Sequence, residues 1–293
     1  MPYLLVFKWT SYPLPVVNDA SSWIEKLRKS SDGEIGDRTH FSGFYSKEFL
    51  EHVRVKYPTV CHLLPLLNDV VHTHAMVRHC MHIMKNITNK ENPGQTPILT
   101  ADQPVYAIGK QVQWMFPNKF PKFVWMMGPL HIEMAFLDAI GDWLDGSGWI
   151  NVLKQSFVNT PGRIDSFIKC SNGKRKRYAH QITLASLIAL AEEAFSQHQC
   201  QTLEYEECKS LLYWLTVIEM ETLLLMFVRS LRESDFELFV RCIRDMLPWL
   251  FALDHTNYAR WMSVFFYDLT NIQNYATDVF LHFKNGAFTI KKI

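Results

Sequence analysis

The stretch that decides the fold runs from Gln95 to Trp149 and reads QTPILTADQPVYAIGKQVQWMFPNKFPKFVWMMGPLHIEMAFLDAIGDWLDGSGW. Two short apolar runs, residues 98–101 and 123–127, are separated by a helical pattern over residues 105–116. This order predicts a strand–helix–strand unit with parallel strands and a right-handed crossover. We therefore expect a helix-rich α/β fold with a small mixed sheet and a large helical insertion.

Polar residues follow each of the two predicted strands. Asp102 comes directly after the first strand, and His131 comes shortly after the second, behind the turn Gly128–Pro129. Parallel neighbours bring their carboxyl ends together, and open α/β sheets bind ligands at that edge. Asp102 and His131 are therefore predicted to share one rim, which is a candidate site without an identified chemistry.

Composition excludes several classes of protein. The 293 residues are 48% hydrophobic and 20% charged, which is typical of a globular chain rather than a disordered one. The formal net charge is +1, so the chain as a whole is not marked as a binder of nucleic acid or of a membrane surface. Six cysteines without a CxxC pair indicate reduced thiols in an intracellular protein, with nucleus and cytoplasm both open.

The pattern along the chain predicts one main domain. Residues 1–45 carry mixed signals and are expected to form a poorly defined leader, and residues 46–293 a single α/β domain with a helical insertion at about 151–247. Near the end, Asn285–Gly286 lies between two strand-like runs, 278–283 and 287–291, and predicts a β-hairpin. Because the chain stops inside the second run, we expect a truncated sequence.

A long apolar segment, residues 211–228, needs a separate interpretation. It has about the minimum length for a membrane span, but Glu219 and Glu221 lie in its middle and are costly in lipid. An enclosed helix fits better, and no membrane is expected. The two carboxylates project about 200° apart on a helix, so one at most faces a given site and the other pairs with a cation such as Arg229 or Arg232.

Three local signals predict where the later helices begin and end. Ser234 and Glu237 form a capping-box pattern, with the serine hydroxyl accepting from the amide three residues on. The helix that follows is expected to run to about Leu247, where Pro248 interrupts it. Asp254 is then a candidate cap for the next helix.

A helical pattern over residues 63–87 concentrates potential metal ligands. Imidazoles one turn apart can share a cation, which suggests zinc or iron binding. The spacing does not complete HExxH or a similar motif, so histidines on a solvated polar face are the alternative. The residues concerned are His72, His74, His79, His82 and Cys80.

A basic run lies in the connection after the central unit. Lys174, Arg175, Lys176 and Arg177 follow one another directly. Such a run is typical of a nucleic-acid contact or of part of a nuclear import signal. The alternative is an ordinary solvated loop.

Four longer stretches resemble a known family. They are NPGQTPILTADQPVYAIGKQVQW, GPLHIEMAFLDAIGDWLDGSGW, ETLLLMFVRSLRESDFELFV and PWLFALDHTNYARWMSV. They resemble, over roughly residues 58–272, a large uncharacterised protein family that is expanded in many copies in some animal genomes, as mobile elements are. The resemblance implies no established activity.

The chain departs from the pattern of that family in two places. Members usually have Gly-Gly-Leu-His where this chain has Gly128–Pro129–Leu130–His131. Members also continue past the final predicted hairpin into an acidic motif similar to Asp-Gln-Ala-His-Glu. If that motif supplies a catalytic carboxylate, this chain is incomplete as an enzyme.

The mobile-element-like expansion of the family that this chain resembles suggests an enzyme that cuts or joins DNA. In nucleases and transposases of the ribonuclease-H type, carboxylates hold Mg²⁺ or Mn²⁺ at the phosphodiester. Asp102 and Glu133 are the candidate metal ligands here, with Glu219 as a possible additional carboxylate and His131 orienting water or phosphate. Each acid also has an ordinary structural role, Asp102 as a helix cap and Glu133 in a first helical turn. We expect the truncated form to be inactive.

The alternative function is a non-catalytic helical scaffold. In that case the aromatic-rich helices bind a protein partner or a second copy of the chain. The near-neutral charge and the nine tryptophans favour this hypothesis. It predicts an oligomer or a stable complex rather than a reaction.

Overall fold

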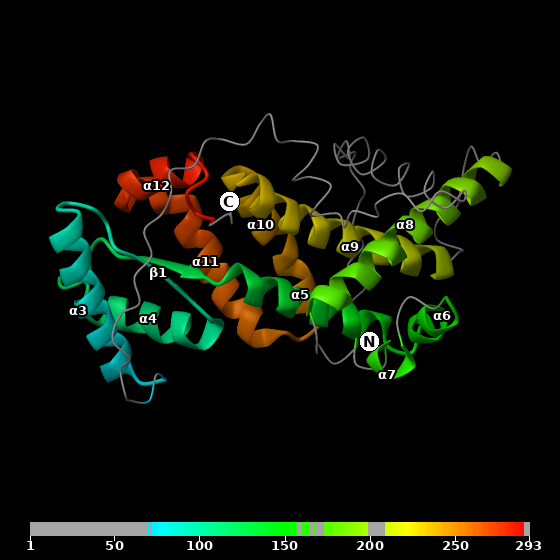
Figure 1. Ribbon diagram of the computed structural model, residues 1–293, viewed down its shortest axis with the longest axis horizontal. Helices are drawn as coiled ribbons and strands as arrows, with labels where there is room; N and C mark the ends of the chain where they lie inside the picture. The colour runs from blue at the N-terminus through cyan, green and yellow to red at the C-terminus, as the bar shows by residue number, and fades with distance from the viewer. Residues whose placement is uncertain are drawn as a thin grey trace.

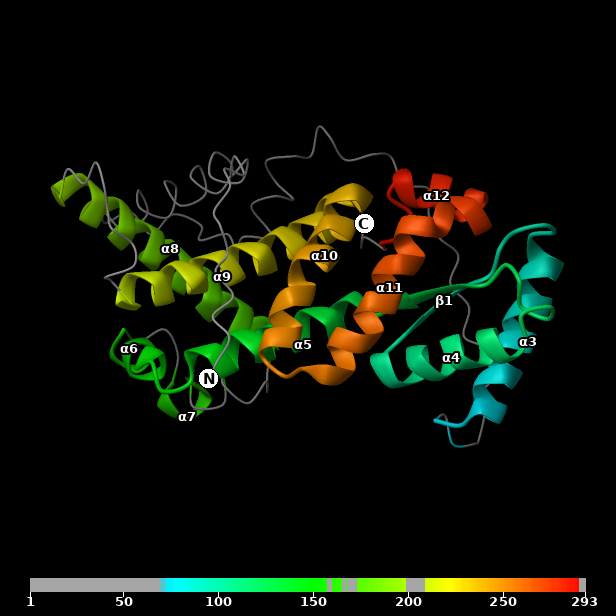
Figure 2. The same ribbon diagram turned by 180° about the vertical axis from the view of Figure 1, so that it is seen from behind.

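The computed structural model describes residues 70, 72–156, 160–164, 167, 173–198 and 209–289. The predicted leader 1–45, the first part of the histidine-containing pattern and the end of the predicted hairpin lie outside these residues. Figure 1 shows an elongated molecule, with α3 and α4 at one end and α6, α7 and α8 at the other. The view from behind shows α5, α10 and α11 between these ends (Figure 2).

The predicted strand–helix–strand unit is confirmed. Strand β1 (Ile98–Ala101), helix α4 (Gln103–Met115) and strand β2 (Val124–Met127) follow one another, and the two strands pair in parallel with Ile98 opposite Val124. All four residues of β2 are buried. Apolar runs bounded by turn residues therefore identified both strands, and the fold is helix-rich α/β.

Helix α4 lies unusually close to the sheet because it carries a glycine at the contact. A Cβ built on Gly109 would lie 2.3 Å from Cζ2 of Trp125 on β2. Only a residue without a side chain fits against that indole. Helix α3 (His74–Glu91) packs on α4 from the other side, and Lys85 on α3 donates to the carbonyl of Lys119.

The remaining elements are helices. Helix α5 (Pro129–Leu144) begins at the predicted Gly128–Pro129 turn and ends before Gly146. Short helices α6 (Trp149–Gln155) and α7 (Pro161–Ile164) lead to the long helices α8 (Gly173–His198) and α9 (Lys209–Glu233), which pack on each other and on α5. Helices α10 (Phe236–Ala252), α11 (Thr256–Tyr275) and α12 (Thr277–Lys284) complete the described chain.

Helix α9 was predicted to be enclosed, and this holds only for its second half, because its buried residues begin at Val217 while Leu212 and Glu219 are exposed. By length and composition alone it is the one described helix that could cross a membrane. In the structure it contacts α5, α8 and α10, and Glu221 in its middle is fully buried. Phe227 and Leu224 are also fully buried, so this part of α9 belongs to the protein core.

The predicted terminal hairpin is wrong. Residues 277–284 form α12, and Asn285–Gly286 ends this helix instead of turning a hairpin. Gly286 has φ 85°, its amide donates to Phe283, and the amide of Ala287 donates to His282. This pattern is a Schellman motif, which needs the same left-handed glycine that a hairpin turn needs. The dipeptide was therefore compatible with both structures.

Three predicted helix boundaries also need correction. The cap of α10 is Asp235, whose carboxylate accepts from Leu238, while Ser234 has φ 59° and its hydroxyl bonds to Thr289. Pro248 does not end α10 but lies inside it. Asp254 does not cap α11, whose N-cap is His255 without a side-chain bond.

Candidate functional site

The predicted rim exists, but Asp102 is used there as a helix cap. The amide of Gly128 donates to the carbonyl of Ala101 over 2.7 Å, so the ends of β1 and β2 are adjacent. The carboxylate of Asp102 accepts from the amide of Val105 at 3.2 Å, which is the capping role considered above. His131 is exposed in the first turn of α5, and its ring lies beside Gly128.

Glu133 lies in the interface between α5 and α8. Its side chain is 5% exposed, and both carboxylate oxygens accept hydrogen bonds from Arg177. Since Glu133 and His131 are two residues apart on a helix, their side chains project about 200° apart. Asp102 and His131 therefore lie at the rim, whereas Glu133 points away from it and forms an ion pair with Arg177.

The basic run is helical rather than a loop. It forms the first turn of α8, and its last two residues are tied to α5. Lys176 is fully buried with its ammonium 3.5 Å from the carboxylate of Asp138, and Arg177 binds Glu133. Lys174 and Arg175 lie in the helix, and their side chains lie outside the described part. The run as described thus stabilises helix packing, and its predicted contact with nucleic acid stays a prediction.

The two acids of α9 have different environments, as their spacing predicted. Glu219 is exposed, but neighbouring groups still remove part of the water around its carboxyl. This partial desolvation, together with the negative charge of Asp245, raises the pKa of Glu219. Glu221 is fully buried and lies 2.9 Å from Nδ1 of His180 on α8. The predicted arginine partner is wrong, because Arg229 pairs with Glu233 and Glu221 pairs with a histidine.

Burial favours the neutral forms of both His180 and Glu221. Desolvation, helped by the charge of Lys176, lowers the pKa of His180 to about 3. Desolvation also raises the pKa of Glu221 well above its ordinary value. The ring of Trp149 stacks on His180 at 4.8 Å, and its indole donates to Thr183. Nε2 of His180 and Oε2 of Glu221 have no hydrogen-bond partner among the described residues.

The histidine-containing helix does not gather its ligands in one place. His72 precedes α3, and His79 and His82 are exposed. His74 instead bonds to Gln111 of α4 at 2.7 Å. Within the described part of the chain, no group of three or more histidine, cysteine or acidic side chains lies close enough to hold a metal ion. The cysteines described, Cys80 and Cys242, are free thiols.

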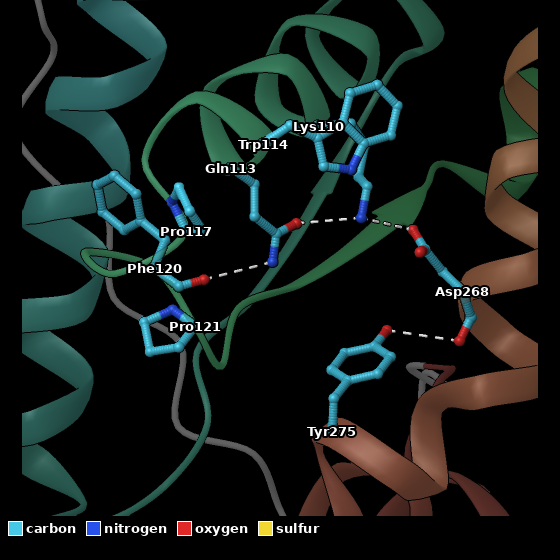
Figure 3. A pocket seen from close by; sticks show the side chains of 8 residues that line it. All are labelled: Lys110, Gln113, Trp114, Pro117, Phe120, Pro121, Asp268 and Tyr275. Carbon is cyan, nitrogen blue, oxygen red and sulfur yellow. Dashed lines mark hydrogen bonds and ion pairs between the residues drawn. The ribbon is translucent and has the colours of Figure 1, made fainter.

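The feature that sequence reasoning missed is a pocket between α4 and α11. It is open to solvent and has a volume of about 330 Å³. Its lining comes from both helices and from the loop that leads to β2, and comprises Lys110, Gln113, Trp114, Pro117, Phe120, Pro121, Asp268 and Tyr275. Figure 3 shows Trp114 and Tyr275 on either side of the Lys110–Asp268 pair.

A buried ion pair forms the floor of this pocket. The ammonium of Lys110 lies 2.8 Å from Oδ2 of Asp268 and donates to Gln113 at 3.1 Å. Tyr106, fully buried, also donates to Oδ2 of Asp268. Burial and the nearby Asp268 raise the pKa of Tyr106, so its hydroxyl stays a donor. Position 110 falls on the same face of α4 as residues 106 and 113, and a lysine on a buried helical face was the available signal.

The comparisons with known proteins identify a family without identifying an activity. Neither curated proteins nor solved structures give a match to this chain. A family model, described as a domain of unknown function, DUF8702, matches residues 41–212 and 192–293. These two matches together cover most of the sequence. The chain therefore belongs to the family of domain of unknown function DUF8702.

Proposed function

We propose that this chain is a non-catalytic helical scaffold that binds a protein partner at the pocket between α4 and α11. The observation that supports this most is the exposed indole of Trp114 at the pocket wall. It is 55% exposed, yet it stacks on Trp261 of α11 with 6.0 Å between ring centroids and 20° between planes. Exposed tryptophans in a fixed orientation are typical energetic centres of protein interfaces.

The polar floor adds specificity to that aromatic wall. Lys110 and Asp268 come from different helices and hold each other in place, so the pocket needs little rearrangement before it binds. A partly apolar pocket with a few fixed polar groups is the usual form of a recognition site. Two of the acids proposed for metal chemistry have structural partners, since Asp102 caps α4 and Glu133 binds Arg177.

The test is quantitative capture of a partner by the full chain and by one pocket variant. Trp114→Ala is expected to lower recovery of the captured partner at least about tenfold, the loss typical of an interface hot spot. Tyr267→Ala is the matched control, because Tyr267 is 67% exposed on α11 and does not line the pocket. A second copy of the chain counts as the partner if Trp114→Ala abolishes a dimer seen by sedimentation. Equal recovery by both variants contradicts the proposal.

A second candidate is a DNA nuclease of mobile-element origin that uses Mg²⁺ or Mn²⁺. The position of Asp102 favours it, because this acid ends β1 next to the end of β2, with His131 nearby. Paired metal ions held by carboxylates stabilise both oxygens of a phosphodiester displacement. The ion pair of Glu133 with Arg177 counts against this candidate.

Nicking of supercoiled DNA with added magnesium or manganese tests the nuclease. Asp102→Ser is the informative variant, because serine keeps the helix cap and removes the metal-binding carboxylate. Loss of nicking in Asp102→Ser, with nicking retained in the exposed control Asp145→Asn, supports this candidate. No nicking by the unmodified chain with either metal excludes it.

A further inference from the structure

We propose that the partner segment bound in this pocket is a proline-rich peptide in the polyproline II conformation. This inference rests on the function proposed above and names the chemistry of the ligand. It follows from three properties of the pocket: its net charge, its unpaired N–H donors, and the side chains of its walls.

The charge of the pocket excludes a strongly charged ligand. The ammonium of Lys110 and the carboxylate of Asp268 compensate each other at 2.8 Å, and both side chains are largely buried, 8% and 15% exposed. The pocket has no other charged lining residue. An acidic peptide or a phosphate would lose hydration without meeting a free opposite charge. A neutral segment fits the site best.

Two N–H donors at the pocket, one on Lys110 and one on Trp114, have no hydrogen-bond acceptor among the described residues. The ammonium of Lys110 has three N–H groups and uses two of them, on Asp268 and Gln113. The indole N–H of Trp114 has no hydrogen-bond partner among the described residues, and the hydroxyl of Tyr275 reaches only the carbonyl of Asp268 at 3.5 Å. A ligand that offers carbonyl oxygens can therefore satisfy these donors.

Proline-rich segments meet this requirement better than other peptides. A prolyl residue has a carbonyl but no N–H, so it brings acceptors without adding donors. In polyproline II the chain makes no internal hydrogen bonds, so these carbonyls are free to accept. The conformation is also preformed, so little entropy is lost when the segment binds.

The walls match the shape and surface of such a segment. Trp114 and Tyr275 lie on either side of the floor, and Pro117 and Pro121 line the pocket next to Phe120, away from these two rings (Figure 3). Grooves lined by aromatic rings are the usual receptors of polyproline II peptides, because the prolyl rings pack flat against the aromatic faces. The stacking of Trp114 on Trp261 fixes one of these faces before the ligand arrives.

The experiment measures binding of an oligoproline peptide of about ten residues to the full chain by calorimetry. A glycine–serine peptide of the same length is the control ligand. We expect saturable binding of the oligoproline and none of the control. Trp114→Ala should weaken binding at least about tenfold, and Trp114→Phe by less, because phenylalanine keeps a ring and loses the N–H donor. Tyr267→Ala should bind as the unmodified chain does.

The outcomes separate this inference from the proposed function. If a captured partner depends on Trp114 but the oligoproline does not bind, the ligand class is wrong and the scaffold function stands. If the oligoproline binds equally well to Trp114→Ala, the inference is overturned. If neither partner nor peptide depends on Trp114, both proposals fail. Circular dichroism of each variant verifies that the helices are intact.

Discussion

The guanidinium of Arg177 donates two parallel hydrogen bonds to the carboxylate of Glu133, each 2.5 Å long. The sequence suggested separate roles for these residues, a metal ligand and a contact to nucleic acid. In the structure they satisfy each other across the interface of α5 and α8. A bidentate pair of this kind fixes the register between two helices as well as neutralising both charges.

Removal of Arg177 should destabilise the fold. Arg177→Met leaves the carboxylate of Glu133, 5% exposed, without its cation, and is expected to lower the free energy of unfolding by about 3–5 kcal/mol. Urea denaturation measures this change. The control Arg244→Met removes an exposed ion pair with Asp245 and should cost at most about 1 kcal/mol.

The double variant Glu133→Gln with Arg177→Met sharpens the same test. Since the buried charge is then absent, it should be more stable than Arg177→Met alone. If Arg177→Met unfolds within about 1 kcal/mol of the unmodified chain, the ion pair has no structural role.

A methyl group at position 109 should also destabilise the protein. In Gly109→Ala the new Cβ meets the indole of Trp125 at 2.3 Å. Overpacking of this kind costs about 1–3 kcal/mol, which is expected to exceed the roughly 1 kcal/mol that alanine gains over glycine in a helix. Thermal and urea unfolding measure the net effect.

A second substitution shows whether the clash with Trp125 is the cause. Adding Trp125→Leu should cost less in the Gly109→Ala background than in the unmodified chain, with a coupling of about 0.5–3 kcal/mol. Additive effects of the two substitutions would contradict this explanation.

Asp278 should stabilise the fold at neutral pH and lose this effect in acid. Its carboxylate accepts from both the amide and the hydroxyl of Thr96, which ties α12 to the entry of β1. Burial alone raises the pKa of Asp278, but these hydrogen bonds outweigh it and lower the pKa below its ordinary value. A lowered pKa stabilises above the unfolded pKa of about 4, and the effect fades as pH falls through the folded pKa.

Asp278→Asn makes this dependence measurable. At pH 7 the variant should be less stable than the unmodified chain, and the difference should shrink below about pH 4. Urea denaturation at several pH values follows it. Asp145→Asn, at an exposed aspartate, should show no such trend. A difference that is constant with pH excludes ionised Asp278 as the origin.

Glu221 is expected to affect stability with a pH dependence opposite to that of Asp278, because burial favours its neutral form. Glu221 keeps its proton in the folded state because burial raises its pKa, whereas it ionises above about pH 4.5 in the unfolded chain. Folding then takes up a proton, so this group costs stability as pH rises toward its folded pKa. Glu221→Gln removes the titration and preserves the size and polarity of the side chain.

The variant should therefore gain stability over the unmodified chain as pH rises from about 4.5 toward the folded pKa of Glu221. The slope of the difference is at most about 1.4 kcal/mol per pH unit. Because the lowered pKa of His180 is present in both proteins, it largely cancels in this comparison. A difference that stays flat with pH would show that Glu221 is ionised in the folded protein. Glu221→Ala should be destabilising at every pH, since it opens a cavity.

The sequence by itself determined the elements whose signals are local. The two strands followed from apolar runs before Asp102 and Gly128–Pro129, and the burial of the second half of α9 from its long apolar segment. The role of Asp102 as a cap was also available, because a cap bonds to an amide only three residues away. Such interactions involve neighbours in the chain, so periodicity and spacing describe them.

Where a local signal fitted two structures, the tertiary contacts chose between them. Asn285–Gly286 suits a hairpin and a helix end equally, since both use a left-handed glycine. Packing of the neighbouring side chains favours the helix end over the hairpin. Phe283 packs against Phe236 of α10 and against Phe288, with ring centroids 5.4 and 6.2 Å apart.

Only the tertiary structure decided which charged groups meet. Arg177 pairs with Glu133, His180 with Glu221, and Lys110 with Asp268. The two members of each pair lie on different helices. The period of a helix shows which of its side chains share a face, but its sequence does not show which other helix packs against that face. The pocket of α4 and α11 depends on that choice of neighbour, because burial and pairing arise only when two distant segments pack together.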